Sequence, residues 1–232
     1  MRFARLQTLY TVFSVICLAG MLVVASCEQP TEKLGCLDCQ PDPPTTPNGL
    51  IGQLRDAYQT RNYDWFSNLF STAADSAPYF FFLNEPQGDN WDLTEELRIH
   101  RRMFKPEDPL PGEFPVPEDL WLVSIDIQLE PQTEWTERAD LYSSDVNPNG
   151  LDPAHWRATE AQYHAYVFFK TKGETDYQVN GLANFVVVED LRKQAGQARK
   201  FLIYRWEDLG SIAAERIAVE SASWGMLKSL YR

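Results

Sequence analysis

Four long stretches in the second half of the chain alternate apolar and polar residues, and this pattern limits the fold more than any other feature. In the first stretch, Trp121 and every second residue up to Leu129 are apolar, whereas Asp126 and its neighbours on the opposite face are polar. Alternation with a period of two is typical of an antiparallel strand with one buried face. The sequence therefore predicts strands over residues 120–129, 159–171, 176–190 and 200–206.

The first half of the chain has the spacing of helices instead. Apolar residues recur at helical spacing over 50–58 and over 93–104, and Asp92 is the predicted cap of the second helix. Asn48 and Asn62 are further predicted caps. The aromatic run 77–83 is a predicted short strand. Together these elements predict an α+β fold, in which N-terminal helices pack on an antiparallel sheet.

The later predicted strands carry large apolar residues on both faces. Phe185 and Val187 share one face, while Leu182 and Val186 share the other. A sheet covered on one side only does not need this distribution. The pattern therefore predicts helices on one face and, on the other, either a second copy of the chain or the apolar tail, residues 211–232, packed back on the domain.

The N-terminal segment has the pattern of a cleavable export signal. Arg2 and Arg5 precede a largely apolar run over 6–24, which is also nearly long enough for a permanent membrane helix. The Val-Ala-Ser-Cys that ends at Cys27 resembles the bacterial lipobox, in which the cysteine is acylated and becomes the first residue of the mature protein. This resemblance favours a lipoprotein signal peptide over 1–26 and a membrane anchor at Cys27.

A polar, Pro-rich linker over 27–47 follows the signal, and the folded domain is predicted over 48–210. In bacterial lipoproteins, aspartate directly after the acylated cysteine favours retention in the inner membrane. Glu28 stands there in this chain. We therefore expect a lipid-anchored protein of the bacterial cell envelope, at the outer membrane where two membranes are present.

Cys36 and Cys39 lie in the linker with two residues between them. A local disulfide or two idle thiols suits an exported chain. A zinc site needs two further ligands, and a redox site needs a thioredoxin-like context.

Asp145, Asn147 and Asn149 alternate as oxygen ligands do in a calcium loop. Trp156 stands where the closing glutamate belongs, and an Asn-Pro-Asn-Gly turn explains the same residues without a metal. The sequence predicts no metal and no cofactor.

The charge balance argues against nucleic-acid binding. The chain has 21 Lys and Arg residues against 33 Asp and Glu residues. Binding to a phosphate backbone depends on clustered cations. The basic run over 98–105 is the local exception, and we interpret it as the solvated face of a helix.

Two short segments and the order of elements carry a family resemblance. Residues 58–63 (YQTRNY) lie at a helix junction, and residues 204–208 (YRWED) end the last long strand. The chain resembles the nuclear transport factor 2-like superfamily, which includes the SnoaL-like polyketide cyclases. The resemblance implies a cone-shaped, cystatin-like roll, in which a curved sheet wraps a long helix and leaves an apolar pocket. Some members isomerise, dehydrate or cyclise small apolar molecules, whereas others bind ligands or dimerise.

Catalysis in such a pocket needs an acid or base beside a proton donor. His164 and Tyr166 share one face of a predicted strand and are the candidate pair, although the opposite face is at least as apolar. His100 lies on the apolar stripe of its helix, which is typical of a hydrogen-bonded packing residue. Asp126 lies opposite an apolar stripe and is a poor candidate for a buried base.

The sequence therefore predicts a membrane-anchored lipoprotein that acts as a non-catalytic module, which binds a small apolar ligand or assembles with protein. One alternative is a pocket enzyme of the cyclase, isomerase or dehydratase type, with His or Tyr acid-base chemistry. A second alternative is a structural spacer.

Overall fold

The computed structural model describes most of the chain after residue 40. The described residues are 41–72, 81–84, 89–142, 151–192, 200–211, 220–222 and 224–232. Several predicted features lie outside these ranges: the signal peptide, Cys27, Cys36 and Cys39, and the loop with Asp145, Asn147 and Asn149. Their predicted roles therefore stay predictions.

Side-chain caps begin the three N-terminal helices. The helices are α2 (Pro47–Thr60), α3 (Tyr63–Ser67), α4 (Leu93–Phe104) and the C-terminal α5 (Trp224–Ser229), with 3-10 turns η2 (Glu118–Leu120) and η3 (Ala139–Tyr142). Asp92 accepts a hydrogen bond from the Glu95 backbone N–H at the start of α4, and Asn62 caps α3, as predicted.

The predicted cap at Asn48 is wrong, because α2 begins two residues earlier than this cap implies, at Pro47. Thr46 accepts from the Gly49 backbone N–H, and Pro47 occupies the first turn, where its missing N–H costs nothing. The Asn48 carboxamide oxygen instead accepts hydrogen bonds from Trp135 and Tyr163. These tertiary contacts could not be inferred from local sequence.

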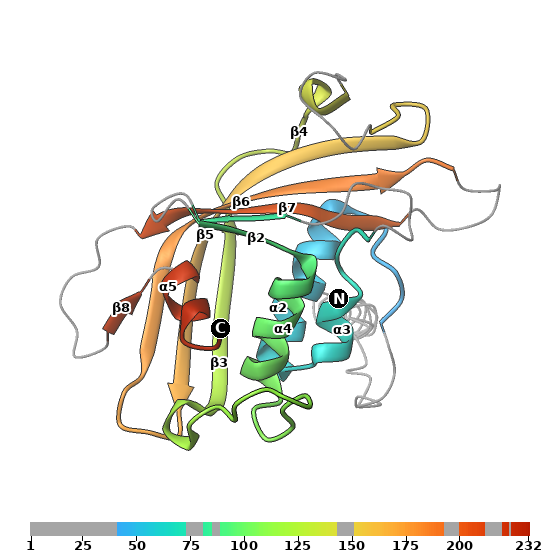
Figure 1. Cartoon of the computed structure of the whole chain (residues 1–232). Helices are drawn as coiled ribbons and strands as arrows, with labels where there is room; N and C mark the ends of the chain where they lie inside the picture. The colour runs from blue at the N-terminus through green and yellow to red at the C-terminus, as the bar shows by residue number, and fades with distance from the viewer. Residues whose placement is uncertain are drawn as a thin grey trace, which may run out of the picture. The chain divides into compact units, whose positions relative to one another are not determined.

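In the described part of the chain, eight strands form one sheet (Figure 1). They are β1 (Phe81–Asn84), β2 (Asp89–Asp92), β3 (Leu122–Pro131), β4 (Thr136–Glu137), β5 (Trp156–Thr171), β6 (Tyr177–Asp190), β7 (Phe201–Ser211) and β8 (Glu220–Ala222). The main order is β2-β1-β7-β6-β5-β3, with β4 paired to β5 and β8 to β6. The four predicted long strands are confirmed as β3, β5, β6 and β7. The pairs β1–β7 and β6–β8 are parallel, and the others are antiparallel.

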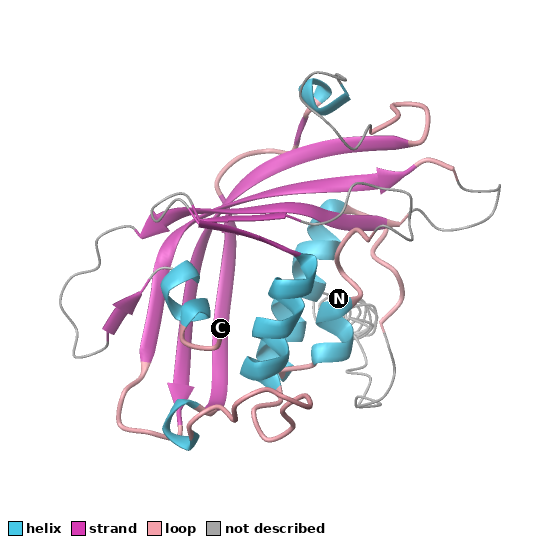
Figure 2. Ribbon diagram, viewed as in Figure 1, coloured by secondary structure: helices cyan, strands magenta, loops and turns pink. Residues whose placement is uncertain are grey.

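The sheet is strongly curved, and the helices lie on its concave side (Figure 2). The inward residues of β5 and β6, such as Val167, Phe169 and Phe185, are fully buried against α2, α3 and α4. This arrangement confirms the predicted α+β class, with N-terminal helices packed on a curved sheet. Several aromatic pairs of the core, such as Tyr58 with Phe66 and Trp206 with Trp224, meet edge to face, an arrangement that aromatic rings favour.

A β-bulge interrupts the alternation predicted for the first long strand. The register between β3 and β5 shifts between Leu122 and Ser124. Because the bulge inserts one residue, Leu122 turns inward and Val123 is 49% exposed. The predicted inward position of Val123 is therefore wrong, whereas Ile125 and Ile127 are buried as expected.

The chain itself covers one end of the outer sheet face. A second apolar cluster there joins Val186 and Val188 to Leu141, Leu151 and other residues around η3. The apolar residues on both faces of β6 therefore need no second subunit at this end. The central part of the outer face, around Tyr166 and Leu182, stays partly exposed.

Candidate functional site

A row of four polar side chains crosses the core between the helices and the sheet. Tyr58 comes from α2, Glu96 and His100 from adjacent turns of α4, and Lys228 from α5. All four are fully buried. Charged side chains are almost never fully buried without a partner, so this row is the most unusual chemistry among the described residues.

The hydrogen bonds fix the tautomer of His100. Burial, with a smaller repulsion from Glu96, raises the pKa of Tyr58 well above its ordinary value, so the phenol keeps its proton and donates to His100 Nε2. The proton of the neutral ring must therefore lie on Nδ1, which donates to the Glu96 backbone carbonyl oxygen at 2.9 Å. Burial lowers the pKa of His100 to about 4, so the ring is neutral near pH 7.

Glu96 and Lys228 form an ion pair inside the core. Lys228 Nζ lies 2.6 Å from Glu96 Oε1, and Trp91 Nε1 donates to Oε2 at 2.6 Å. Burial alone would raise the pKa of Glu96, but the nearby charge and hydrogen bond of Lys228 outweigh it and hold the pKa below its ordinary value. Burial lowers the pKa of Lys228, and Glu96 opposes that shift. The carboxylate therefore meets an ammonium and an indole N–H.

Aromatic rings surround the rest of the Lys228 ammonium. Its nitrogen lies 3.7 Å from the ring centre of Phe82 and 4.1 Å from that of Trp206. The rings of Trp91 and Trp224 lie at 5.8 and 5.7 Å. These distances are within reach of cation–π attraction, which replaces part of the lost hydration.

The Tyr58–His100 pair has the residue types for general acid-base catalysis, but it is closed off in this structure. The Trp224 ring packs edge to face on Tyr58, with centroids 5.2 Å apart, and the Phe66 ring stacks on His100 at 4.0 Å. Both polar side chains have no exposed surface. A substrate reaches this pair only if the side chains around it, those of α5 among them, move.

His164 and Tyr166, the candidate pair from the sequence, do not join this row. Both are half-buried on the outer face of β5, away from the helices. His164 Nε2 lies 2.6 Å from the side-chain oxygen of Asn180 on β6. The inner face of β5 carries Tyr163, Ala165 and Val167, so the buried core lies on the face that the sequence gave as the alternative.

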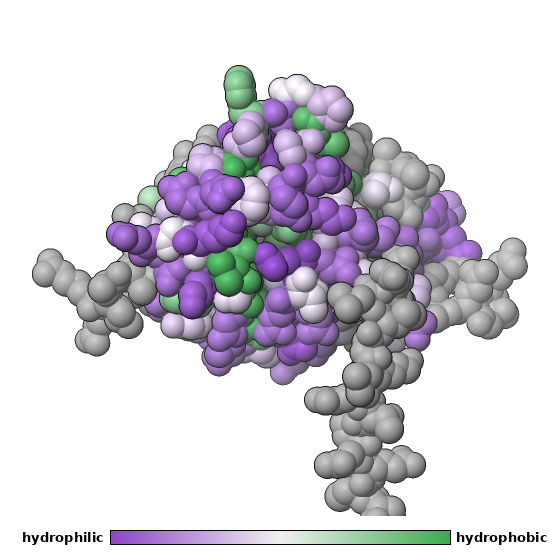
Figure 3. All heavy atoms as spheres, turned by 90° about the horizontal axis from the view of Figure 1, so that it is seen from below, coloured by the Kyte–Doolittle hydropathy of each residue, from purple (hydrophilic) through white to green (hydrophobic). Residues whose placement is uncertain are grey.

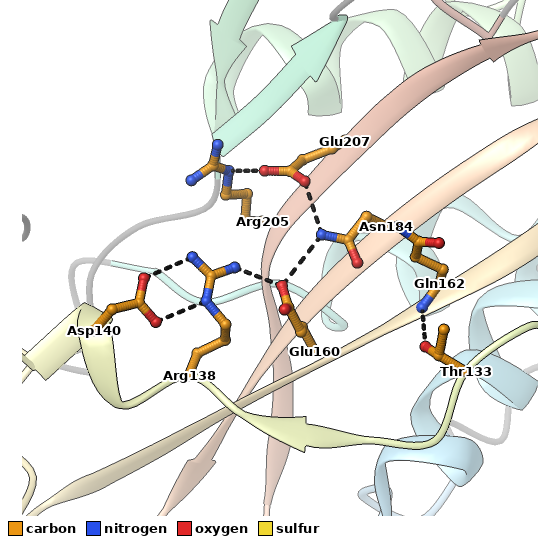
Figure 4. Close-up of polar contacts among 8 residues, drawn as sticks. All are labelled: Thr133, Arg138, Asp140, Glu160, Gln162, Asn184, Arg205 and Glu207. Atoms are coloured by element: carbon orange, nitrogen blue, oxygen red, sulfur yellow. Dashed lines mark hydrogen bonds and ion pairs between the residues drawn. The ribbon is translucent and has the colours of Figure 1, made fainter.

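A second polar cluster lies farther along the outer face (Figure 4). Arg138, which follows β4, binds Asp140 through two hydrogen bonds of 2.8 Å and also binds Glu160. Asn184 donates to Glu207 at 2.7 Å and more weakly to Glu160 at 3.4 Å. The hydrogen bonds from Arg138 lower the pKa of Asp140. Because charges of both signs are paired, we interpret this cluster as the attachment of the β4–η3 segment to the sheet.

A small surface pocket lies between α2 and the strands β3 and β5. It measures about 170 Å³ and is lined by Ile51, Arg55, Leu129, Tyr163 and their neighbours. Pockets for drug-sized ligands span roughly 300–1,000 Å³. This pocket therefore has room only for a small group.

Exposed apolar side chains are scattered. Phe114 is 85% and Leu110 42% exposed in the segment between α4 and β3. Figure 3, viewed from below relative to Figure 1, shows isolated hydrophobic residues among many hydrophilic ones. Single exposed hydrophobic residues are common on protein surfaces and define no site.

The described residues contain no metal-binding cluster and no membrane-spanning helix. No three His, Cys, Asp or Glu side chains in it gather closely enough to hold a metal ion. None of the helices in the same residues has the length and apolarity to cross a membrane.

Comparison with known proteins gives distant likeness to solved structures. Neither a protein-family model nor a curated protein sequence matches this chain. A crystal structure from Streptomyces avermitilis, described as an NTF2-like family protein with a provisional dehydratase assignment, aligns with a TM-score of 0.38 and 11% identity. The alignment covers 68% of this chain and 88% of that one. At so low a TM-score, the likeness supports neither a fold nor a function for this chain.

The sequence did not predict the roles of Glu96, Lys228 and Trp91. His100 is a buried, hydrogen-bonded packing residue, as its place on the apolar stripe of α4 indicated. The signal for Lys228 was one lysine among the apolar residues Trp224, Leu227 and Tyr231, which are all buried. A lone cation on an apolar helix face needs a buried partner, but its spacing does not say which carboxylate supplies it.

The depressed pKa of His100 predicts a specific loss of stability in acid. The unfolded chain binds a proton near pH 6.5, whereas the folded chain resists protonation of His100 until about pH 4. The contribution of the neutral His100 to the unfolding free energy therefore keeps its full value above pH 6.5. It falls by roughly 3 kcal/mol in total as the pH falls toward 4. Denaturant unfolding of wild type and His100→Gln at several pH values measures it.

The difference in unfolding free energy between these two proteins should shrink steadily from pH 6.5 to 4. His155→Gln, at a surface histidine whose side chain is 53% exposed, controls for the removal of a histidine and should keep the pH profile of wild type. Parallel profiles for wild type and His100→Gln would contradict the neutral, buried assignment of His100.

Proposed function

We propose that this chain is a lipoprotein of the bacterial cell envelope, whose folded domain binds a ligand or a partner and does not catalyse a reaction. The acylated Cys27 holds it to the membrane, at the outer membrane where two membranes are present. Residues 27–47 act as a spacer. In this proposal, residues 48–210 are a domain of the nuclear transport factor 2-like superfamily, and the tail over 211–232 completes its core.

One observation supports the non-catalytic part of the proposal: side chains of α5 fill the space between the sheet and the helices. Trp224 and Lys228 of α5 pack between the sheet and the helices, against Tyr58, Glu96 and Trp206. The groups with acid-base potential are thereby closed off. A general base must come within hydrogen-bond reach of the proton that it removes, which this packing prevents.

A pocket enzyme is the second candidate, and the Tyr58–His100 hydrogen bond favours it. A neutral imidazole bonded to a phenol can pass a proton to or from a bound substrate. This candidate requires that α5 leave the core during turnover.

The partly exposed centre of the outer sheet face supports assembly as a homodimer. His164, Tyr166 and Phe168 of β5 lie beside Asn180 and Leu182 of β6 on this face, and all five are half-buried. A twofold interface places the same patch on both copies. A single substitution in the patch therefore changes both sides of the interface.

Sedimentation of the detergent-solubilised full-length protein tests the homodimer. Wild type is expected to sediment as a dimer, and Phe168→Glu as a monomer, because two buried carboxylates would face each other across the axis. Leu110→Glu, at an exposed apolar residue outside the patch, is the matched control and should stay dimeric. A monomeric wild type, or a dimeric Phe168→Glu, would remove the sheet face as the interface.

Intact-mass spectrometry of protein extracted from bacterial membranes tests the anchor. Wild type is expected to lack residues 1–26 and to carry diacylglyceryl and acyl mass on Cys27. Cys27→Ala should keep its leader and gain no lipid, and Cys36→Ala, the control, should mature as wild type does. An unacylated wild type that retains residues 1–26 in the membrane would contradict the lipoprotein assignment.

A further inference from the structure

We propose that the aromatic cage around Lys228 is a binding site for a small alkylammonium ligand, and that α5 occupies it with the chain's own lysine in this structure. The cage is defined as Phe82, Trp91, Trp206 and the Glu96 carboxylate. This inference rests on the proposed binding function and names the ligand class of the interior site.

The residues of the cage are held together by contacts that do not involve α5. Phe82 belongs to β1, Trp91 to β2 and Trp206 to β7, and Glu96 lies on α4. Phe82 stacks on Trp91 with ring centres 4.3 Å apart, and its ring meets that of Trp206 at 5.8 Å. Trp91 Nε1 also holds the Glu96 carboxylate. The cation-binding surface is therefore assembled by contacts within the rest of the domain.

Packing of the core alone does not require a charge at Lys228. Taking an ammonium and a carboxylate out of water costs several kcal/mol for each ion, and well-packed apolar residues often replace a buried pair without loss of stability. The Lys228 ammonium is nevertheless fully buried against Glu96, with aromatic rings on its other sides. Rings that face a cation, with a carboxylate at one end, are the chemistry by which proteins recognise organic ammonium groups.

In this proposal, α5 is an occupant that a ligand can displace. It has six residues, and so short a helix has no stability of its own. Its polar attachments include the Lys228–Glu96 pair, the Gly225 backbone N–H to Asp208, and the Tyr231 hydroxyl to the Leu120 carbonyl. The side chains of Trp224, Leu227 and Lys228 are buried, so opening α5 exposes apolar surface, but a terminal segment can open at a lower free energy than the whole domain unfolds.

The fit of α5 is also incomplete. Within the described residues, the indole N–H groups of Trp206 and Trp224 are buried without a hydrogen-bond acceptor. A buried donor without an acceptor costs about 1–3 kcal/mol. This cost lowers the free energy that a competing ligand must supply.

The ligand class follows from the contacts of Lys228. Its Nζ lies at hydrogen-bond distance from Glu96 Oε1, so the ligand needs an N–H, and its stem lies among rings, so the ligand needs a short alkyl chain. A primary alkylammonium meets both needs. It can come from a free amine or from a lysine side chain, and the two are distinguished below.

The main experiment uses Lys228→Ala in the full-length protein. This substitution removes a group equivalent to n-propylammonium, and added n-propylammonium chloride should bind saturably and raise the unfolding temperature. Neutral n-propanol and sodium chloride are the controls for apolar filling and for salt, and neither should produce this effect. Lys228→Met, which fills the site without a charge, controls for the substitution and should not bind the amine.

Four further measurements test the cage, the displacement of α5 and the source of the ammonium group. Glu96→Gln in the Lys228→Ala background should weaken n-propylammonium binding about tenfold or more, because a charged acceptor is lost. In wild type, the amine should bind about a hundredfold more weakly than to Lys228→Ala, or weaker still, since α5 competes for the site. Bound amine should also speed hydrogen exchange of the α5 backbone amides. The same binding measurement with Nα-acetyl-lysine methylamide distinguishes a lysine side chain from a free amine. Tighter binding than that of n-propylammonium indicates a lysine side chain, and weaker binding indicates a free amine.

Each result decides the proposal. Saturable binding to Lys228→Ala, with faster α5 exchange in wild type, supports it, as does a Lys228→Ala protein that folds only when the amine is added. Absence of binding, equal stabilisation by n-propanol, or binding to the variant without faster exchange in wild type would each overturn it. None of these outcomes alters the lipid mass on Cys27, so failure here is separable from failure of the proposed envelope function.

Discussion

The buried ion pair between Glu96 and Lys228 is the interaction on which the interior of this protein depends. It joins α4 to the C-terminal α5 across 132 positions of sequence. It brings Trp224 onto Tyr58 and Trp206, which completes the aromatic core. Lys228 lowers the pKa of His100 and the Glu96 carboxylate raises it by more, so burial is what keeps that ring neutral. Without the pair, Glu96 would be an uncompensated charge in a low-dielectric interior.

The pair is tolerated because its surroundings replace much of the hydration that both ions lose. One carboxylate oxygen accepts from Lys228 and the other from Trp91, so both oxygens have a strong donor. The ammonium faces Phe82 and Trp206 at distances where the ring quadrupole attracts a cation. The same features that make the pair tolerable also make the site selective for a cation. This is why the interior suits binding of an ammonium group better than an apolar core would.

Local sequence predicted the elements of this fold but not the contacts between distant ones. Periodicity located α4 and the four long strands, since spacing of apolar residues directly reflects a buried face. The caps Asp92 and Asn62 were predicted because capping involves residues only three positions apart. The bulge at Val123 and the use of Asn48 in tertiary hydrogen bonds depend on partners far along the chain. The Glu96–Lys228 pair also joins residues that are far apart in the sequence, so the candidate site could be identified only from the three-dimensional structure.

A double-mutant cycle at Glu96 and Lys228 tests the central claim most directly. The unfolding free energies of wild type, Glu96→Gln, Lys228→Met and the double variant give the coupling between the two side chains. Each single variant should lose about 3–5 kcal/mol, because one buried partner loses its counterpart. The double variant should lose at least about 2 kcal/mol less than the sum of the two. Additive losses would show that the two side chains do not depend on each other, and would contradict the account.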